Sequence, residues 1–293
     1  MRRFDWRRRI EQLDPATDYH EIYRIMAAHE FPWDMNQALS FALFRTYAVP
    51  SIGGLLARTG EFLERPQQRY DDTTLLLDAV VEHGFGSVPT RDAFRRINQM
   101  HGAYRITNDD MRYVLSTFVV VLLRWMDAYG WRPFTETEKV ASANYYRRLG
   151  GHMNIKSVPE TYQEFSVLAD AYEREHFAFD EGGRAVAEST LRLLATFPPS
   201  HRLPAGLVRR ACFALMDDPL LEAFGFPFPH PVLRSVVRTG LATRGRVVRY
   251  LPPRKTPRYA RQLPNLRTYP CGYEITQLGT FPGSSNNDRR GRS

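Results

Sequence analysis

Apolar residues recur every three or four positions along most of the chain, which is the period of an α-helix. The first helical segment is DYHEIYRIMAAHEF, and EFPWD ends it. The pattern predicts further helices at residues 35–60, split near Pro50 and Gly53–Gly54; at 66–84; from Thr90 to 101–104; from TNDD to YGWRPF; from TETEK onward; and at 159–176, 181–196, 205–224 and 229–246. No alternating strand pattern and no repeat of about 20–50 residues is present, so the predicted fold class is all-α.

Helix caps and one long apolar stretch refine this pattern. Thr90 is expected to cap the helix that follows it, and Thr135 with Glu138 has the spacing of a capping box. The longest apolar stretch, VLSTFVVVLL, begins at Val114 and ends before Arg124. It is half the length of about 20 residues that a membrane span requires. We therefore expect a buried helix and no membrane span.

Cysteine usage and the first residues bear on the cellular compartment. The two cysteines, Cys212 and Cys271, are far apart and form no CxxC motif, which excludes a disulfide framework and a cysteine zinc site. The opening MRRFDWRRRIEQLD lacks the apolar run of a signal peptide. These features favour a reducing compartment, and we expect a cytoplasmic protein.

Prolines end the regular pattern from YLPPRKTPRY onward. We expect one helical domain at residues 1–251 and an irregular C-terminal segment at 252–293, partly disordered after about 280. Residues 246–293 hold ten basic and two acidic residues, an excess equal to the formal net charge of the whole chain, +8. The segment is interpreted as a solvated basic end, with weak association with anionic surfaces as the alternative. No nucleic-acid partner is expected, and deletion after Gly279 should leave folding unchanged.

The common catalytic motifs are not present. The chain has no GxGxxG after a strand, no GxxxxGK[ST] and no GxSxG. The HExxH pattern that starts at His20 fails because residue 24 is arginine. Glu173 and His176 form one ExxH pair, but a di-iron bundle needs two such pairs. This pair is therefore interpreted as the polar end of a helix.

His101 lies where an apolar residue is expected. Phe94, Ile97 and His101 share one helical stripe in RRINQMHGAYRI, so the imidazole points toward the core. It is either a core histidine with a hydrogen-bond partner or a ligand of a bound group. Spacing alone leaves both alternatives open.

A second polar cluster opens the helix that begins after Pro66. Arg69, Asp72 and Thr73 lie on the stripe that Leu76 and Val80 continue. Burial of an arginine and an aspartate costs several kcal/mol unless the charges are paired or meet a ligand. The alternative is an Arg69–Asp72 ion pair at the surface, which stabilises by less than about 1 kcal/mol.

The order of these motifs resembles a known family. EFPWD, a proline-split helix, RYDDT and NQMHGAY are followed by YGWR, a P-x-T helix start, GFP, PPR and YPCGY. This order is similar to that of the rubber oxygenases (latex-clearing proteins), a family that includes the endoplasmic-reticulum-bound oxygenase of mycophenolic acid biosynthesis. The resemblance covers residues 30 to 279. It implies a globin-like helical core around one haem b, and oxidative cleavage of a carbon chain with O₂.

The resemblance also implies roles for individual residues. His101 matches the single proximal ligand of the haem iron, and Arg69 and Thr73 match polar residues on the distal side, with Arg69 also in contact with the cofactor. Asp72 stands where rubber oxygenases have a lysine that can coordinate the iron. We expect Asp72 to stay off the iron, paired with Arg69 or holding a water, and to act in proton transfer. The family's catalytic glutamate has no clear counterpart, because neither Glu61 nor Glu64 aligns.

These observations predict a haem b-dependent oxygenase that acts on O₂ and a small apolar substrate, isoprenoid or aromatic. The proposed catalytic residues are Arg69, Asp72 and Thr73. One alternative is a helical protein that binds haem or lipid without catalysis. A further alternative is a basic-tailed interaction protein without a cofactor.

Overall fold

The helices of the computed structural model, which describes residues 1–280, follow the periodic segments of the sequence. They are α1 (Asp5–Ile10), α2 (Tyr19–Ile25), α3 (Pro32–Thr46), α4 (Pro50–Arg58), α5 (Glu61–Glu64), α6 (Pro66–His83), α7 (Val88–Gly102), α8 (Asn108–Tyr129), α9 (Glu136–His152), α10 (Tyr162–His176), α11 (Glu181–Ala195), α12 (Ala205–Leu215), α13 (Asp218–Phe224) and α14 (Pro231–Val248). A π-helical turn, η1 (Met26–Glu30), continues α2, and short 3-10 turns are η2 (Ser200–Arg202), η3 (Ala260–Gln262) and η4 (Ile275–Gln277). No strand occurs in residues 1–280, which confirms the all-α class.

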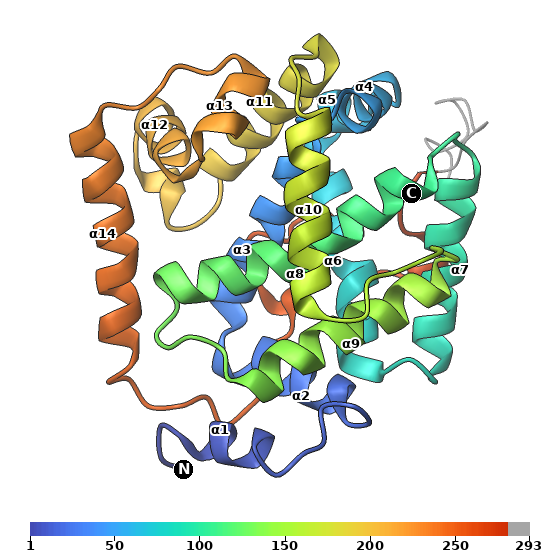
Figure 1. Cartoon of the computed structure of the whole chain (residues 1–293), viewed down its shortest axis with the longest axis vertical. Coiled ribbons are helices and arrows are strands. Elements are labelled where there is room, and N and C mark those ends of the chain that lie inside the picture. The colour runs from blue at the N-terminus through green and yellow to red at the C-terminus, as the bar shows by residue number, and fades with distance from the viewer. Residues whose placement is uncertain (281–293) are drawn as a thin grey trace.

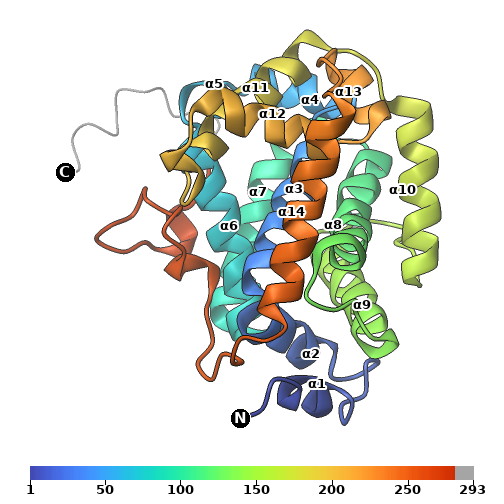
Figure 2. The ribbon, with the colours of Figure 1, turned by 90° about the vertical axis from the view of Figure 1, so that its left-hand side faces the viewer.

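Helix α8 crosses the middle of the molecule, with α3, α9, α10 and α14 packed against it (Figures 1 and 2). Its side chains Val119, Leu122 and Met126 are buried, which confirms the buried helix predicted from the apolar stretch. The main core lies between α8 and helices α2, α3, α6, α7 and α9. The chain therefore forms one helical domain around α8. The globin-like arrangement around a haem stays a prediction.

A smaller core lies at the upper end of Figure 1, where α4, α5, α11, α12 and α13 gather. It packs against the C-terminal end of α3 through Phe44. Arg45 of α3 fixes this end further, because its guanidinium binds Glu173 of α10 at 2.5 Å and Asp217 at 2.6 Å. Helices α4 and α11 cross where Gly53 faces Gly183. Two glycines let the backbones approach more closely than any other residue pair would allow.

We expect Gly53→Ala to lower the free energy of unfolding by about 2–3 kcal/mol, because an added methyl group overpacks this crossing. Its Cβ would overlap the carbonyl oxygen of Tyr47 and lie 2.6 Å from Cα of Gly183. Gly240→Ala on α14 is the control, since nothing lies within 4 Å of a Cβ there. Urea unfolding compares the two variants. Equal stability would show that α4 and α11 separate without cost.

Two details of the helices differ from the sequence predictions. The cap of α7 is Ser87 rather than Thr90: the Ser87 hydroxyl accepts the Thr90 amide at 3.2 Å, and Thr90 is buried one turn inside the helix. The helix predicted at 205–224 is two helices, α12 and α13. The break falls before Pro219, which has no amide hydrogen and therefore starts a helix more readily than it continues one. The capping box of Thr135 and Glu138 is confirmed.

Residues 258–280, called here the C-terminal strap, run along α6 and α7. They are irregular apart from η3 and η4, as the prolines predicted. Their interpretation as a solvated end is wrong in part: many of these residues are exposed, but Leu278 is 1% exposed and Asn265 is 8% exposed. Arg96 of α7 donates to the carbonyl oxygens of Leu278, at 2.6 Å, and of Thr280. The disorder predicted after about 280 lies outside the described residues.

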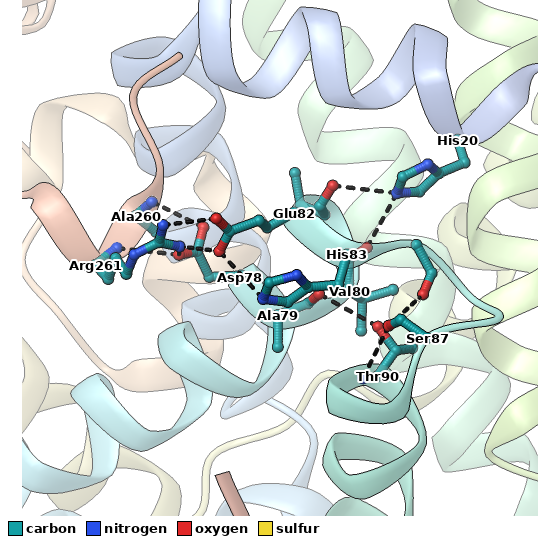
Figure 3. A network of polar contacts seen from close by, with 12 residues as sticks. His20, Asp78, Ala79, Val80, Glu82, His83, Ser87, Thr90, Ala260 and Arg261 are labelled. Carbon is teal, nitrogen blue, oxygen red and sulfur yellow. Dashed lines mark hydrogen bonds and ion pairs between the residues drawn. The ribbon is translucent and has the colours of Figure 1, made fainter. Parts of the chain in front are cut away.

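Buried carboxylates of α6 hold the strap by its backbone amides. Asp78 accepts the amides of Ala260 at 2.8 Å and Arg261 at 3.2 Å, on the side of α6 that Figure 3 shows. Asp71 accepts the amides of Arg267 at 2.9 Å and Thr268 at 2.8 Å, and the Thr268 hydroxyl at 2.6 Å. Both carboxylates are buried, so the strap supplies the partners that their desolvation requires.

Candidate functional site

Arg69 and Thr73 form one unit on the first half of α6. The Arg69 guanidinium donates to the Thr73 hydroxyl, which in turn donates to the Arg69 carbonyl oxygen at 2.9 Å. The guanidinium carbon also lies 5.2 Å from the ring centre of Phe62. Burial lowers the pKa of Arg69, though its charge is retained at neutral pH. This arginine is not part of a surface ion pair, since its hydrogen-bond partner is a neutral hydroxyl.

Asp72 has a different partner from the one expected. Its carboxylate accepts the hydroxyl of Tyr269 and the backbone amide of Gly279, both in the C-terminal strap. Burial raises the pKa of Asp72, and these two donors oppose that shift. The expected pairing with Arg69 is therefore wrong: the strap delivers a hydroxyl to the carboxylate, and Arg69 acts on it only as a more distant charge.

His101 lies near the C-terminal end of α7. Its Nδ1 is buried and has no hydrogen-bond partner within residues 1–280. Burial first, and then the charge of Arg69, lowers the pKa of the imidazole to about 4. The ring is therefore neutral at physiological pH. The first alternative drawn from the sequence, a core histidine with a hydrogen-bond partner, therefore does not hold for Nδ1.

A cavity of about 130 Å³ lies between α3, α6, α11 and the strap. Its walls are largely apolar, with Met35, Leu39 and Leu43 on α3. Arg69 and Thr73 line it, whereas Asp72 and His101 do not. The structure thus brings Arg69 to the cavity and within electrostatic reach of His101. It places Asp72 apart from the cavity, toward the strap.

The strap contributes residues that the sequence did not single out for the site. Tyr269 and Gly279 bind Asp72, and Gly279 has a left-handed φ of +82°. A side chain at Gly279 would overlap the sulfur of Met100, the residue before His101. The motif YPCGY, noted only as part of the family resemblance, contains Tyr269. Its contact with Asp72 joins residues 197 positions apart, which no local pattern reveals.

The side chains that could coordinate a metal suit a cofactor whose own atoms supply most of the metal's ligands. No group of three or more His, Cys, Asp or Glu side chains within the described residues could hold a metal ion. A haem supplies four nitrogen ligands from its macrocycle and needs only one from the protein, for which a neutral imidazole is a common choice. His101 fits this requirement, because its ring is neutral and its Nδ1 is unpartnered.

Comparison with known proteins places the chain in an oxygenase class. Residues 23–250 match the family described as ER-bound oxygenase mpaB/B'/Rubber oxygenase, catalytic domain. The match covers more than half of the chain, and the chain belongs to this family. The resemblance drawn from the sequence motifs is thereby confirmed.

Three fungal relatives are similar to the chain. It is 31% identical to ER-bound oxygenase mpaB' of Penicillium brevicompactum over 83% of its length, and 28% identical to ER-bound oxygenase mpaB of the same species over 83%. It is 29% identical to mpaB of Penicillium roqueforti (strain FM164) over 73% of its length. The matched region spans 62% of the length of mpaB' and 60% of that of mpaB from P. brevicompactum. It spans 78% of the length of mpaB from P. roqueforti.

In residues 1–280 no single helix is both long enough and apolar enough to cross a bilayer. Helices α3 and α4 meet the length and composition criteria only as a pair, and they are bent by 95° at the break between them.

Proposed function

We propose that this protein is a haem b-dependent oxygenase that uses O₂ to oxidise a small apolar substrate, isoprenoid or aromatic. Membership of the oxygenase family supports the reaction class. The observation that supports haem most directly is the neutral imidazole of His101: its Nδ1 is buried without a hydrogen-bond partner within residues 1–280, and burial and the charge of Arg69 lower its pKa. An unsatisfied buried nitrogen costs free energy in the protein alone, and a bound metal removes that cost.

The residues of the chain have distinct proposed roles around the cofactor. His101 would hold the iron as the single protein ligand, and Arg69 is the cation available to an anionic carboxylate of the haem. When bound, haem b supplies the redox-active iron through which such oxygenases use O₂. Thr73 fixes the Arg69 guanidinium by accepting its hydrogen bond.

In this proposal the cavity binds the substrate, and the hydrogen-bonded pair of Asp72 and Tyr269 takes part in proton transfer. Because the cavity walls are mostly apolar, the cavity favours an apolar molecule and excludes water. Asp72 and Tyr269 share a hydrogen bond that can hold a proton between carboxylate and phenol oxygens. Burial raises the pKa of both groups, which favours the protonated pair. Neither Asp72 nor Tyr269 lines the cavity, so in this proposal the pair holds the proton outside the cavity, on the side of the strap.

The proposal is tested by spectroscopy and oxygen uptake on the same preparation. Protein expressed with added haem precursor should show a Soret band, and its O₂ consumption should rise on addition of isoprenoid or aromatic substrates. A Soret band without substrate-dependent O₂ consumption would favour the non-catalytic binding protein. A colourless protein would contradict haem dependence and favour an interaction protein without a cofactor.

A further inference from the structure

An exposed apolar patch spans the last turn of α14 and the residues after it, where the chain turns toward α1. Val247 is 56% exposed, Tyr250 85% and Leu251 51%. These three residues lie within five positions of the sequence, so they form one patch rather than scattered surface residues. Contiguous exposed apolar groups on a folded protein mark interaction surfaces.

Basic residues surround this patch. Arg246, Arg249, Arg254 and Lys255 are all exposed, and residues 246–255 contain no acidic residue. Among residues 1–280, none of the four forms an ion pair. Their charges are therefore available to an anionic partner.

Helix α1 extends the same surface. The indole nitrogen of Trp6 donates to the carbonyl oxygen of Arg254 at 2.8 Å, which joins α1 to the segment that leaves α14. Both views show these two parts together at the lower end of the molecule (Figures 1 and 2). Phe4, which precedes α1, is 39% exposed, and α1 adds three arginines at residues 7–9, whose charges are paired with Glu11, Asp5 and Glu21. The surface thus combines segments from both ends of the sequence.

The chain is fixed to the rest of the protein both before and after the patch. Before it, Arg244 binds Asp34 at 2.6 Å, and Gly245 packs against the carbonyl oxygens of Tyr129 and Gly130. After it, the amide of Arg258 donates to the carbonyl oxygen of Ala28 at 2.8 Å. A surface that is already ordered loses little conformational entropy on binding.

We infer that this surface, residues 2–9 together with 246–255, docks on membranes that contain anionic phospholipids. Tyrosine is favoured at the headgroup level of a bilayer, where its ring is apolar and its hydroxyl remains hydrated. Val247 and Leu251 have the aliphatic side chains that enter the acyl boundary, while arginines bind lipid phosphates. A nucleic-acid backbone would use the arginines but give no partner to Val247 and Leu251.

The test uses the full chain and vesicle sedimentation. The wild-type protein should bind vesicles of phosphatidylcholine mixed with phosphatidylserine in equal parts, and should bind vesicles of phosphatidylcholine alone much more weakly. Each exposed arginine contributes about fivefold to binding near an anionic surface. The pair Arg246→Gln/Arg249→Gln should therefore weaken binding by about 25-fold, and added salt should weaken the wild type.

Apolar variants and matched controls separate docking from general charge attraction. Tyr250→Ser/Leu251→Ser should reduce binding at unchanged net charge, whereas Val167→Ser, at a site on α10 that is 70% exposed, should not. Arg192→Gln, at an exposed position on α11, controls for the loss of charge. Circular dichroism should be the same for all variants.

Three results would overturn the inference. The first is an absence of binding to the anionic vesicles by the wild type. The second is that the patch variants bind as tightly as their controls. The third is that the wild type self-associates with rising concentration, or is retained on duplex DNA, and that the Tyr250→Ser/Leu251→Ser variant loses this property while its vesicle binding is unchanged. The surface would then bind another partner. None of these depends on haem, so the outcome is independent of the proposed oxygenase activity.

Discussion

His101→Ala is expected to abolish the Soret band of protein expressed with haem precursor while the helical circular dichroism is retained. The proposed iron has one protein ligand, so removal of this imidazole removes the only bond between metal and chain. The fold should survive, because Nδ1 of His101 has no hydrogen bond to lose. Alanine is also the best helix former, and residue 101 lies inside α7.

His201→Ala is the matched control, since His201 lies exposed in η2. The other histidines should each be replaceable with the band intact: His20, His29, His83, His152, His176 and His230. Full haem content in His101→Ala would place the ligand elsewhere. A wild-type protein that binds no haem would instead remove the cofactor from the proposed function altogether.

Asp71→Ala is expected to lower the free energy of unfolding by about 3 kcal/mol, through loss of the strap's attachment to α6. The Asp71 carboxylate is fully buried and accepts hydrogen bonds from Gln67, Arg267 and Thr268. Alanine leaves these donors without a partner, and each unsatisfied buried donor costs about 1–3 kcal/mol. Loss of the buried charge offsets part of this cost.

Urea unfolding measures the effect, with the exposed Asp127→Ala on α8 as the control. The control should change the free energy of unfolding by less than about 0.5 kcal/mol. Asp71→Asn should fall between the two, since its amide oxygen still accepts hydrogen bonds but its NH₂ group faces other donors. A cost below about 1 kcal/mol for Asp71→Ala would mean that the strap contributes little to stability.

The helices were predictable because their signals are local. The apolar period, the proline at residue 50 and the pair Thr135–Glu138 each act within one or two helical turns. The same locality explains the errors at the caps. Ser87 and Thr90 both have a hydroxyl, and only the path of the chain through Pro89 decides which of them caps α7. The break between α12 and α13 likewise falls just before a proline, Pro219, where the apolar pattern alone continues.

The candidate site was predictable only in part. The motif order indicated His101, Arg69 and Thr73 together. In the structure Arg69 donates a hydrogen bond to Thr73, and its charge lowers the pKa of His101. The partner of Asp72 was not predictable. This partner, Tyr269, lies in the strap, whose prolines and arginines resemble those of a solvated tail. Only the folded structure shows that the buried carboxylates of α6 need hydrogen-bond donors from this segment. Long-range hydrogen bonds of this kind leave no periodic signal in the sequence.

The attachment of the strap has a consequence for the order of events during protein synthesis. Chains fold from the N-terminus as they emerge, at about 5–20 residues per second. Helix α6 is made nearly 200 residues before its partners in the strap, as the separation of 197 between Asp72 and Tyr269 shows. For about 10–40 s, therefore, the carboxylates of α6 remain hydrated and the cavity lacks one wall. Tyr259, Ala260 and Leu263 of the strap supply that wall, so synthesis of the strap closes the cavity on this side.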